Sequence, residues 1–205
     1  MTSNARGALA AAIIGSATVF LDGTIVNVAL PRIGATLPAV AIGVLEGQIY
    51  VVAGYTATLA AFLLLAGALG DQYGRRRVFL AGLVLFGLTS LACGLAPSLD
   101  VLAIARLLQG VAGALLVPGS LAIITALFEG PERARAFGIW ASATSAVVVL
   151  GPPIGGALVE VFGWRSIFLL NAPLIAVGVV LTLRYVPVLQ PAMIRARFDW
   201  AGALV

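Results

Sequence analysis

Residues 65–82 read LAGALGDQYGRRRVFLAG and place one aspartate and three arginines between two long apolar runs. The flanking runs have the length and composition of helices that cross a lipid bilayer. Glycine allows helices to approach closely and a chain to turn tightly, and the arginines suit a loop at an anionic membrane surface. This stretch therefore predicts two membrane helices joined by a short charged turn.

The composition of the whole chain agrees with a membrane protein. Of its 205 residues, 61% are hydrophobic and only 10% are charged, and the mean hydropathy is +1.12. A soluble domain needs far more polar surface than this. At about 20 residues a span, the length suits six membrane-crossing helices. We therefore expect an all-α integral membrane protein that interacts with the lipid bilayer.

Apolar runs mark six expected spans, followed by a polar tail. We expect the six spans at residues 8–30, 48–69, 78–96, 101–127, 136–160 and 166–184. Residues 1–184 would then form a six-helix domain and residues 185–200 a cytoplasmic linker. Residues 201–205 read as the beginning of a seventh span that is cut short, since they are far too few to cross a bilayer.

The arginines predict the orientation of the spans. If the N-terminus is cytoplasmic, nine arginines fall on the cytoplasmic side and only Arg32 and Arg165 on the other, which leaves Arg106 within a span. This bias predicts a cytoplasmic N-terminus, a cytoplasmic tail and a multi-pass protein of the cell membrane. The net charge of +4 then serves membrane topology, and no nucleic-acid partner is expected.

The residue types absent from the chain limit its chemistry. There is no histidine, and the single cysteine, Cys93, lies inside an apolar run. A Ser–His or Cys–His nucleophile pair is therefore impossible, and no Walker-type glycine loop is present. We expect no enzyme activity, no metal and no cofactor, so any energy for transport comes from an ion gradient.

Several ordered motifs resemble one transporter family. Besides the charged turn, they are LDGTIVNVALP at residues 21–31, RLLQGVAGA from Arg106, LGPPIGGAL from Leu150 and GWRSIFLLNAP at residues 163–173. Together they resemble the N-terminal six-helix half of the major facilitator superfamily, in its fourteen-span drug:proton antiporter branch. Gln72, Val147 and Tyr50 depart from the usual pattern. The resemblance implies export of small lipophilic drugs or antibiotics, some of them cationic, in exchange for protons, together with a missing C-terminal half.

Asp22 and Arg106 are the expected proton-coupling residues. An intramembrane acid marks an ion or proton pathway by default. From the helical rise, Asp22 lies ~12 Å and Arg106 ~9 Å below the outer ends of their spans, at similar depth. We expect them to interact directly or through water, with protonation of Asp22 loosening the pair. The alternative is a permanent salt bridge that only neutralises two buried charges.

The charged turn has two readings. It anchors the topology at the cytoplasmic surface, and the resemblance implies that it also latches the outward-open state against the second half. The expected latch contains Gly67, Asp71, Gly74, Arg75, Arg76 and Glu129. Glu129 is the candidate partner of Arg75, with Glu132 and Arg133 as alternatives.

Two further groups complete the candidate sites. Pro152 and Pro153 remove helical N–H donors, and Gly151, Gly155 and Gly156 give small faces for close packing, which the resemblance assigns to the seal with the other half. A candidate substrate cavity has four polar residues, each of which could equally form an interhelical hydrogen bond. These are Asn27, Gln48, Tyr55 and Gln109.

Three functions remain open. The leading one is the N-terminal half of a proton-coupled multidrug or antibiotic exporter that works by alternating access. A nutrient:proton symporter fits less well with the first-span motif and the GPPIGG stretch. A six-helix membrane module without transport activity of its own is the third.

Overall fold

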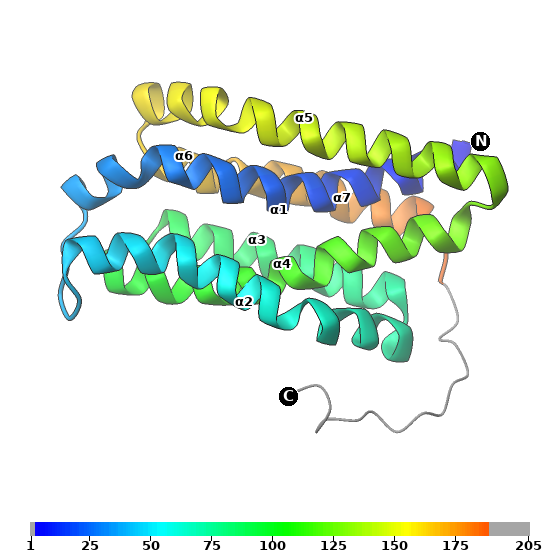
Figure 1. Ribbon diagram of the computed structural model, residues 1–205, viewed down its shortest axis with the longest axis horizontal. Helices are drawn as coiled ribbons and strands as arrows, with labels where there is room; N and C mark the ends of the chain where they lie inside the picture. The colour runs from blue at the N-terminus through cyan, green and yellow to red at the C-terminus, as the bar shows by residue number, and fades with distance from the viewer. Residues whose placement is uncertain (1–2, 189–205) are drawn as a thin grey trace.

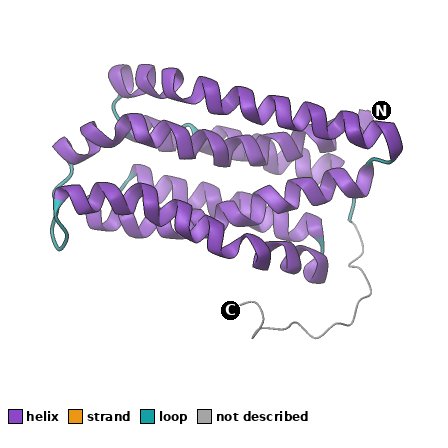
Figure 2. Cartoon of the chain, viewed as in Figure 1, coloured by secondary structure: helices purple, strands orange, loops and turns teal. Residues whose placement is uncertain are grey.

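The computed structural model describes residues 3–188 and is built from helices joined by short loops (Figures 1 and 2). In chain order the helices are α1 (Ser3–Thr36), α2 (Val44–Tyr73), α3 (Arg75–Gly94), α4 (Leu99–Leu127), α5 (Gly130–Phe162), α6 (Arg165–Leu169) and α7 (Asn171–Tyr185). With α6 and α7 taken together, six helical segments of this part of the chain are long and apolar enough to cross a membrane. The prediction of an all-α fold with six spans is confirmed.

The helices form a bundle around α1 and α4. Helix α4 packs most closely on α2 and α3, whereas α1 packs on α5 and α7 and also contacts α4 (Figure 1). Helix α5 therefore lies on the outside of the bundle, and only four of its residues are buried: Ala136, Thr144, Gly151 and Gly155.

The first helix is longer than the sequence predicts. It continues past Pro31 to Thr36, six residues beyond the expected end. Proline removes one N–H that would bond the carbonyl four residues earlier, and that residue, Asn27, is exposed. The last turns are held by the buried Ile33 and by a 2.9 Å hydrogen bond from Trp164 Nε1 to Thr36 Oγ1.

The sixth span is assigned as two consecutive helices. Leu170 separates α6 from α7, but its backbone is still helical (φ −58°, ψ −31°), so the span keeps its direction. Pro173 lies one turn further on and has no N–H to donate to the Leu169 carbonyl. This missing bond explains why the helix is interrupted here.

The turns explain how adjacent helices reverse direction. Gly74 alone separates α2 from α3 and has φ +96°, a left-handed conformation that glycine adopts without steric cost. At the opposite end of the bundle, the Asp100 carboxylate accepts hydrogen bonds from the backbone N–H groups of Val40, Ala41 and Ile42, at 2.9, 2.9 and 3.2 Å. One side chain thereby fixes the loop before α2.

Most arginines gather at one end of the bundle. Because consecutive helices run in opposite directions, the beginnings of α1, α3 and α5 lie together with the end of α7 (Figure 1). This end carries Arg6, Arg75, Arg76, Arg77, Arg133, Arg135 and Arg184. The grouping is the one that a cytoplasmic face requires, and the orientation itself stays a prediction. The expected linker from residue 189 on and the expected seventh span lie outside the described residues.

Candidate functional site

An ion pair occupies the middle of the bundle. Asp22 projects from α1 and Arg106 from α4, and Arg106 Nη1 donates to Asp22 Oδ2. Both side chains are 1% exposed. The two charges are therefore removed from water and from lipid, which is stable only when each has several further partners. The predicted direct interaction is present, whereas its role in proton coupling stays a prediction.

Arg106 has partners besides Asp22. Its Nε donates to the Val51 carbonyl at 3.0 Å, and its Nη1 donates to Gln109 Oε1 at 2.7 Å. The Tyr55 ring centroid lies 3.9 Å from the guanidinium carbon, within the range of a cation–π contact. Arg106 is therefore held from α2 and from its own helix even when the bond to Asp22 is discounted.

The second carboxylate oxygen of Asp22 faces two amides. Its Oδ1 accepts from Gln109 Nε2 at 3.2 Å and from Asn171 Nδ2 at 2.8 Å. With the bond from Arg106, three side-chain donors converge on this carboxylate. Both oxygens of this buried carboxylate therefore have hydrogen-bond donors, as a buried charge requires.

A short chain of polar groups continues from Asn171. Its Nδ2 also donates to Ser90 Oγ at 2.8 Å, and Ser90 Oγ donates to the Phe168 carbonyl at 2.9 Å. On the other side, Cys93 Sγ donates to Gln109 Oε1 at 3.3 Å. The Oδ1 atom of Asn171 is buried and has no hydrogen-bond partner. Helices α1, α2, α3, α4 and α7 thus supply side chains to the polar cluster, and α6 contributes only the Phe168 backbone carbonyl. We define the cluster by its side chains: Asp22, Tyr55, Ser90, Cys93, Arg106, Gln109 and Asn171.

Sequence reasoning missed three members of this cluster. Asn171 lies in the motif GWRSIFLLNAP but is not among the expected site residues, Cys93 appears only where a nucleophile pair is excluded, and Ser90 is not a candidate. An amide inside an apolar run is the same kind of signal as Asp22, because polar groups in a span need partners. That signal was available for Asn171, whereas a serine or a cysteine in an apolar run is too common to point to a site.

The four expected cavity residues divide into two pairs. Tyr55 and Gln109 join the polar cluster, and Tyr55 Oη also donates to the Val19 carbonyl at 3.0 Å. Asn27 is exposed and donates to Gly23 in its own helix at 3.0 Å, while Gln48 Nε2 donates to the Leu30 carbonyl at 2.8 Å. The structure therefore does not bring Asn27 or Gln48 to the cluster.

The charged turn forms its own set of contacts. Arg75 bonds Asp71 Oδ1 through Nε at 3.3 Å and Nη2 at 3.2 Å, and its Nη1 donates to the Ala122 carbonyl of α4 at 3.1 Å. Arg76 donates to the Leu183 carbonyl of α7 at 2.7 Å. The turn thus connects α2 and α3 to α4 and α7. Gly67 and Gly70 line a small pocket against Gly119 and Ala122.

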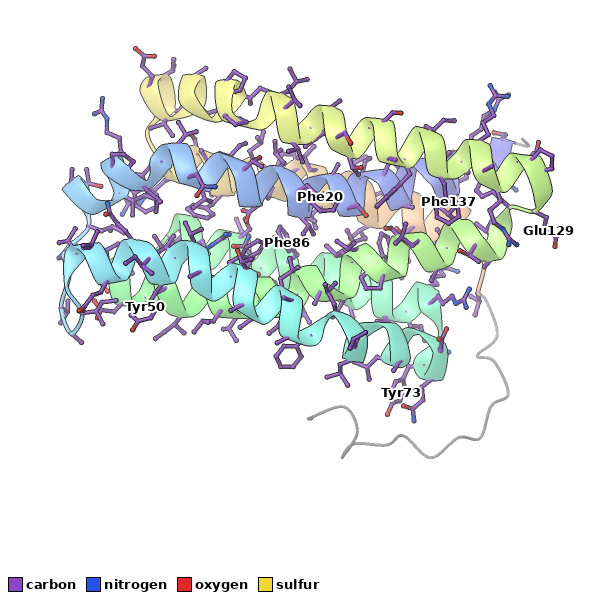
Figure 3. All side chains as sticks on the ribbon, viewed as in Figure 1. Phe20, Tyr50, Tyr73, Phe86, Glu129 and Phe137 are labelled. Carbon is purple, nitrogen blue, oxygen red and sulfur yellow. The ribbon has the colours of Figure 1, made fainter. Side chains whose placement is uncertain are left out.

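Glu129 does not pair with Arg75 within the described part of the chain. It occupies the N-cap position of α5, and its side chain points outward at the end of the bundle (Figure 3). Asp71 lies only four residues before Arg75 and forms the ion pair with its guanidinium instead. Arg133, one of the alternatives, donates from Nε to the Phe128 carbonyl at 2.7 Å. The expected Arg75–Glu129 contact is therefore wrong for this conformation.

The Gly-Pro stretch turns its glycines toward α1. Gly151 and Gly155 are buried against Thr24 and Ile25, whereas Pro152 and Pro153 are exposed. Gly156 is half-buried, and α5 continues unbroken through both prolines. The small-residue face therefore packs within this bundle rather than facing outward. Of the motif, only the face that carries the prolines is exposed on the outside of the bundle.

The fold and the cluster define a class before any relative is considered. Six apolar helical segments of membrane-spanning length form a bundle with a buried ion pair, whose two side chains have further hydrogen-bond partners. A charged turn connects helices at one end of the bundle. No group of three or more potential metal-ligating side chains occurs among the described residues. This is the architecture of a multi-pass membrane protein whose centre is built to hold charge.

Comparison with known proteins identifies the family. Residues 12–201 match the model of the Major Facilitator Superfamily, so the chain belongs to that superfamily. This is a family of transporters, which confirms the expectation that the chain is not an enzyme, and it places the chain in the cell membrane as a multi-pass protein.

The relatives carry names that refer to drug and antibiotic resistance. The multidrug resistance protein Stp of Mycobacterium tuberculosis is 46% identical over 194 residues, which cover 94% of this chain and 35% of Stp. The methylenomycin A resistance protein of Streptomyces coelicolor is 43% identical, covering 81% of this chain and 34% of that protein. The drug efflux pump JefA of M. tuberculosis is 38% identical, covering 100% and 39%. The chain thus spans about a third of the length of these relatives.

Proposed function

We propose that this chain is the N-terminal six-helix half of a proton-coupled exporter of small lipophilic drugs or antibiotics. The observation that carries the proposal is the buried Asp22–Arg106 pair at the centre of the polar cluster. A carboxylic acid in such a place either holds a permanent salt bridge or binds and releases a proton during transport. The names of the relatives favour a transport role.

The surroundings of Arg106 support coupling rather than a permanent bridge. If Asp22 takes up a proton, the guanidinium keeps the Val51 carbonyl, Gln109 Oε1 and the Tyr55 ring. The positive charge is thus not left without partners, so neutralising Asp22 does not impose the full penalty of an unpaired buried charge. A site of this kind has two protonation states that the fold can accommodate.

The exposed faces of α2 and α5 support a second half as partner. On α5 the residues Val149, Leu150 and Ile154 are exposed together with the two prolines. On α2 the residues Leu45, Ile49 and Tyr50 are exposed near one end (Figure 3). In the alternating-access mechanism, two such bundles rock against each other around a site near the bilayer midplane. We infer that these faces and the charged turn meet the second bundle, where the turn acts as a latch.

The experiment that tests the function is drug export by the natural gene product. An antibody against residues 190–199 measures its mass in membranes, and a fluorescent lipophilic cation measures efflux from a drug-sensitised bacterial host under an imposed pH gradient. We expect a product more than twice the 20.9 kDa of this chain, and proton-driven efflux that Asp22→Asn abolishes.

The control for this assay is Glu160→Gln, which removes an exposed acid near the end of α5. It should leave efflux unchanged. Full proton-driven efflux in the Asp22→Asn variant would eliminate the coupling role. A product of 20.9 kDa without efflux would favour a membrane module that does not transport by itself.

A further inference from the structure

The polar cluster contains one amide group whose hydrogen bonding is incomplete. The Nδ2 atom of Asn171 has two acceptors, Asp22 Oδ1 and Ser90 Oγ, while its Oδ1 atom is buried with none. Asn171 is only 1% exposed. Buried polar groups without a partner are uncommon and need an explanation.

The contacts of Asp22 determine which of its oxygens can bind a proton. Oδ2 faces the Arg106 guanidinium, which has only donors and no acceptor. A proton on Oδ2 would therefore point at another donor. Oδ1 faces the amides of Gln109 and Asn171, and an amide also carries an acceptor oxygen. A proton at Oδ1 gains an acceptor when one of the two amides presents its oxygen, whereas a proton at Oδ2 faces a group with donors only.

Gln109 is not free to do so. Its Oε1 atom already accepts from Arg106 Nη1 and from Cys93 Sγ, so turning this amide would break both bonds. Asn171 differs, because its oxygen has no bond to lose. Reversing Asn171 removes the bonds of its Nδ2 to Asp22 Oδ1 and Ser90 Oγ, and two bonds to its Oδ1 replace them when Asp22 is protonated. Of the two amides on Asp22 Oδ1, Asn171 is therefore the one whose oxygen loses no bond on reversal.

We propose that the side-chain amide of Asn171 rotates by half a turn when Asp22 is protonated. The rotation makes the hydrogen bond between Ser90 and α6 depend on the charge of Asp22. Asn171 is a positioning residue in this scheme, which rests on the proposed proton-coupling function of Asp22. Hydronium delivers the proton, so that one of its O–H bonds breaks and water leaves, while an O–H bond forms on the Asp22 carboxylate. The new carboxylic acid O–H donates to Asn171 Oδ1. No other covalent bond forms or breaks.

The turned amide also changes the bond that Ser90 makes. With Asp22 ionised, Ser90 Oγ accepts from Asn171 Nδ2 and donates its hydrogen to the Phe168 carbonyl at 2.9 Å. With Asn171 Oδ1 in the place of Nδ2, the serine hydroxyl donates to that oxygen instead and releases Phe168. A proton on α1 thus alters a backbone contact in α6, the first part of the interrupted sixth span.

None of the charged or titratable groups around Asp22 prevents the Asn171 amide from rotating. The titratable or charged side chains that face Asp22 are Tyr55 from α2, Cys93 from α3 and Arg106 from α4. The charged residues of α5 lie in its terminal turns and those of α6 and α7 at the ends of the sixth span. None of these groups bonds the free oxygen of Asn171.

The test measures the distance between two labelled groups in the bilayer-embedded natural gene product. This chain has three asparagines, Asn4, Asn27 and Asn171, and four aspartates, of which Asp22 alone bonds an asparagine side chain in the described residues. Solid-state NMR on protein with ¹⁵N side-chain asparagine and ¹³C-carboxyl aspartate detects the coupling across the short Asn171–Asp22 distance as the signal that disappears in the Asn171→Leu variant. That comparison separates it from signals of asparagines and aspartates elsewhere in the natural gene product. Turning the amide moves its nitrogen by about 2 Å, because nitrogen and oxygen are bonded to one carbon at ~1.3 and ~1.2 Å.

The expected result is a loss of this coupling in step with the protonation of Asp22, which the ¹³C shift reports in the same sample. The exposed Asn27 is the internal control, and its signal should not follow Asp22. Asn171→Leu assigns the signal and should lower proton-driven efflux by about tenfold, the effect of one lost hydrogen bond, whereas Asn27→Leu should not.

The outcomes separate this inference from the proposed function. If Asp22 titrates while the Asn171–Asp22 coupling stays constant, the amide does not turn and the inference is wrong, although proton coupling stands. If Asp22 remains ionised across the pH range in which efflux operates, the proton-coupling proposal itself fails.

Discussion

The ring of Tyr55 lies against the guanidinium of Arg106, with 3.9 Å between the ring centroid and the guanidinium carbon. The hydroxyl of the same side chain donates to the Val19 carbonyl of α1 at 3.0 Å. Tyr55 therefore joins α2 to the central charge by its face and to α1 by its edge. The two contacts can be removed separately by substitution.

For Tyr55 we expect a graded loss of thermal stability. Tyr55→Phe keeps the ring and loses the bond to Val19, at a cost of about 1 kcal/mol. Tyr55→Leu loses the ring as well, which adds about 1–2 kcal/mol for a desolvated cation–π contact. Thermal unfolding in detergent measures both. Tyr50→Phe, at a position 53% exposed, is the matched control and should be neutral. Equal losses for the two Tyr55 variants would contradict a role for the ring.

For the ion pair we expect the double substitution to be milder than the single one. Asp22→Leu leaves Arg106 with one fewer acceptor but with Val51, Gln109 and Tyr55 still in place, so it should cost less than the ~3–5 kcal/mol of a fully unpaired buried charge. Asp22→Leu combined with Arg106→Met removes both charges and should recover part of that loss. A double-mutant cycle by chemical unfolding measures the coupling. Additive losses would mean that the pair contributes no interaction energy.

For α5 we expect neighbouring glycines to respond differently to alanine. A methyl group at Gly155 would come within 2.8 Å of Ile25 Cγ2, whereas at Gly156 it would meet only Val28 Cγ1 at 3.8 Å. Gly155→Ala should therefore cost about 1–3 kcal/mol through overpacking between α1 and α5, and Gly156→Ala should be neutral or slightly stabilising. Thermal unfolding separates them. In an Ile25→Ala background, which removes Cγ1 and Cγ2, the loss caused by Gly155→Ala should be smaller, and an equal loss would point away from this contact.

For the charged turn we expect a substitution to slow drug efflux while leaving the stability of the protein unchanged. The side chains of Arg75 and Asp71 are 32% and 60% exposed, so their ion pair contributes at most about 1 kcal/mol. Asp71→Asn should shift the unfolding temperature little. If the turn is a latch, the same variant slows drug efflux severalfold, while Glu129→Gln, which has no contact with Arg75, does not. Unchanged efflux in the Asp71→Asn variant would reduce the turn to a topology anchor.

The sequence predicted how deep in the membrane a residue lies, but it did not predict which side of its helix faces the centre of the bundle. Helical rise placed Asp22 and Arg106 at one level, and Gln109 follows Arg106 by three residues, so it lies on the same face of α4. These relationships are local and can be counted along the chain. Whether Asn27 or Gln48 faces the centre depends on how whole helices are rotated, which follows from packing between distant segments.

The charged turn shows the same limit. Gly74 predicted the tight reversal, because a residue with positive φ is favoured at such a turn. The choice of Asp71 over Glu129 as partner of Arg75 depends on three-dimensional distance across two helix ends. Asp100 is a similar case, since nothing in its own segment indicates that it bonds a loop about 60 residues earlier in the chain.

The residues of the polar cluster enter the membrane at different times, because the chain is synthesised from its N-terminus. Asp22 enters the membrane 84 residues before Arg106 and 149 residues before Asn171. Until the fourth span is inserted, the carboxyl group has no arginine, and in an apolar medium its neutral form is far cheaper to accommodate. The closing of the bundle around Arg106 is therefore the step at which the Asp22 carboxyl group first gains a charged partner.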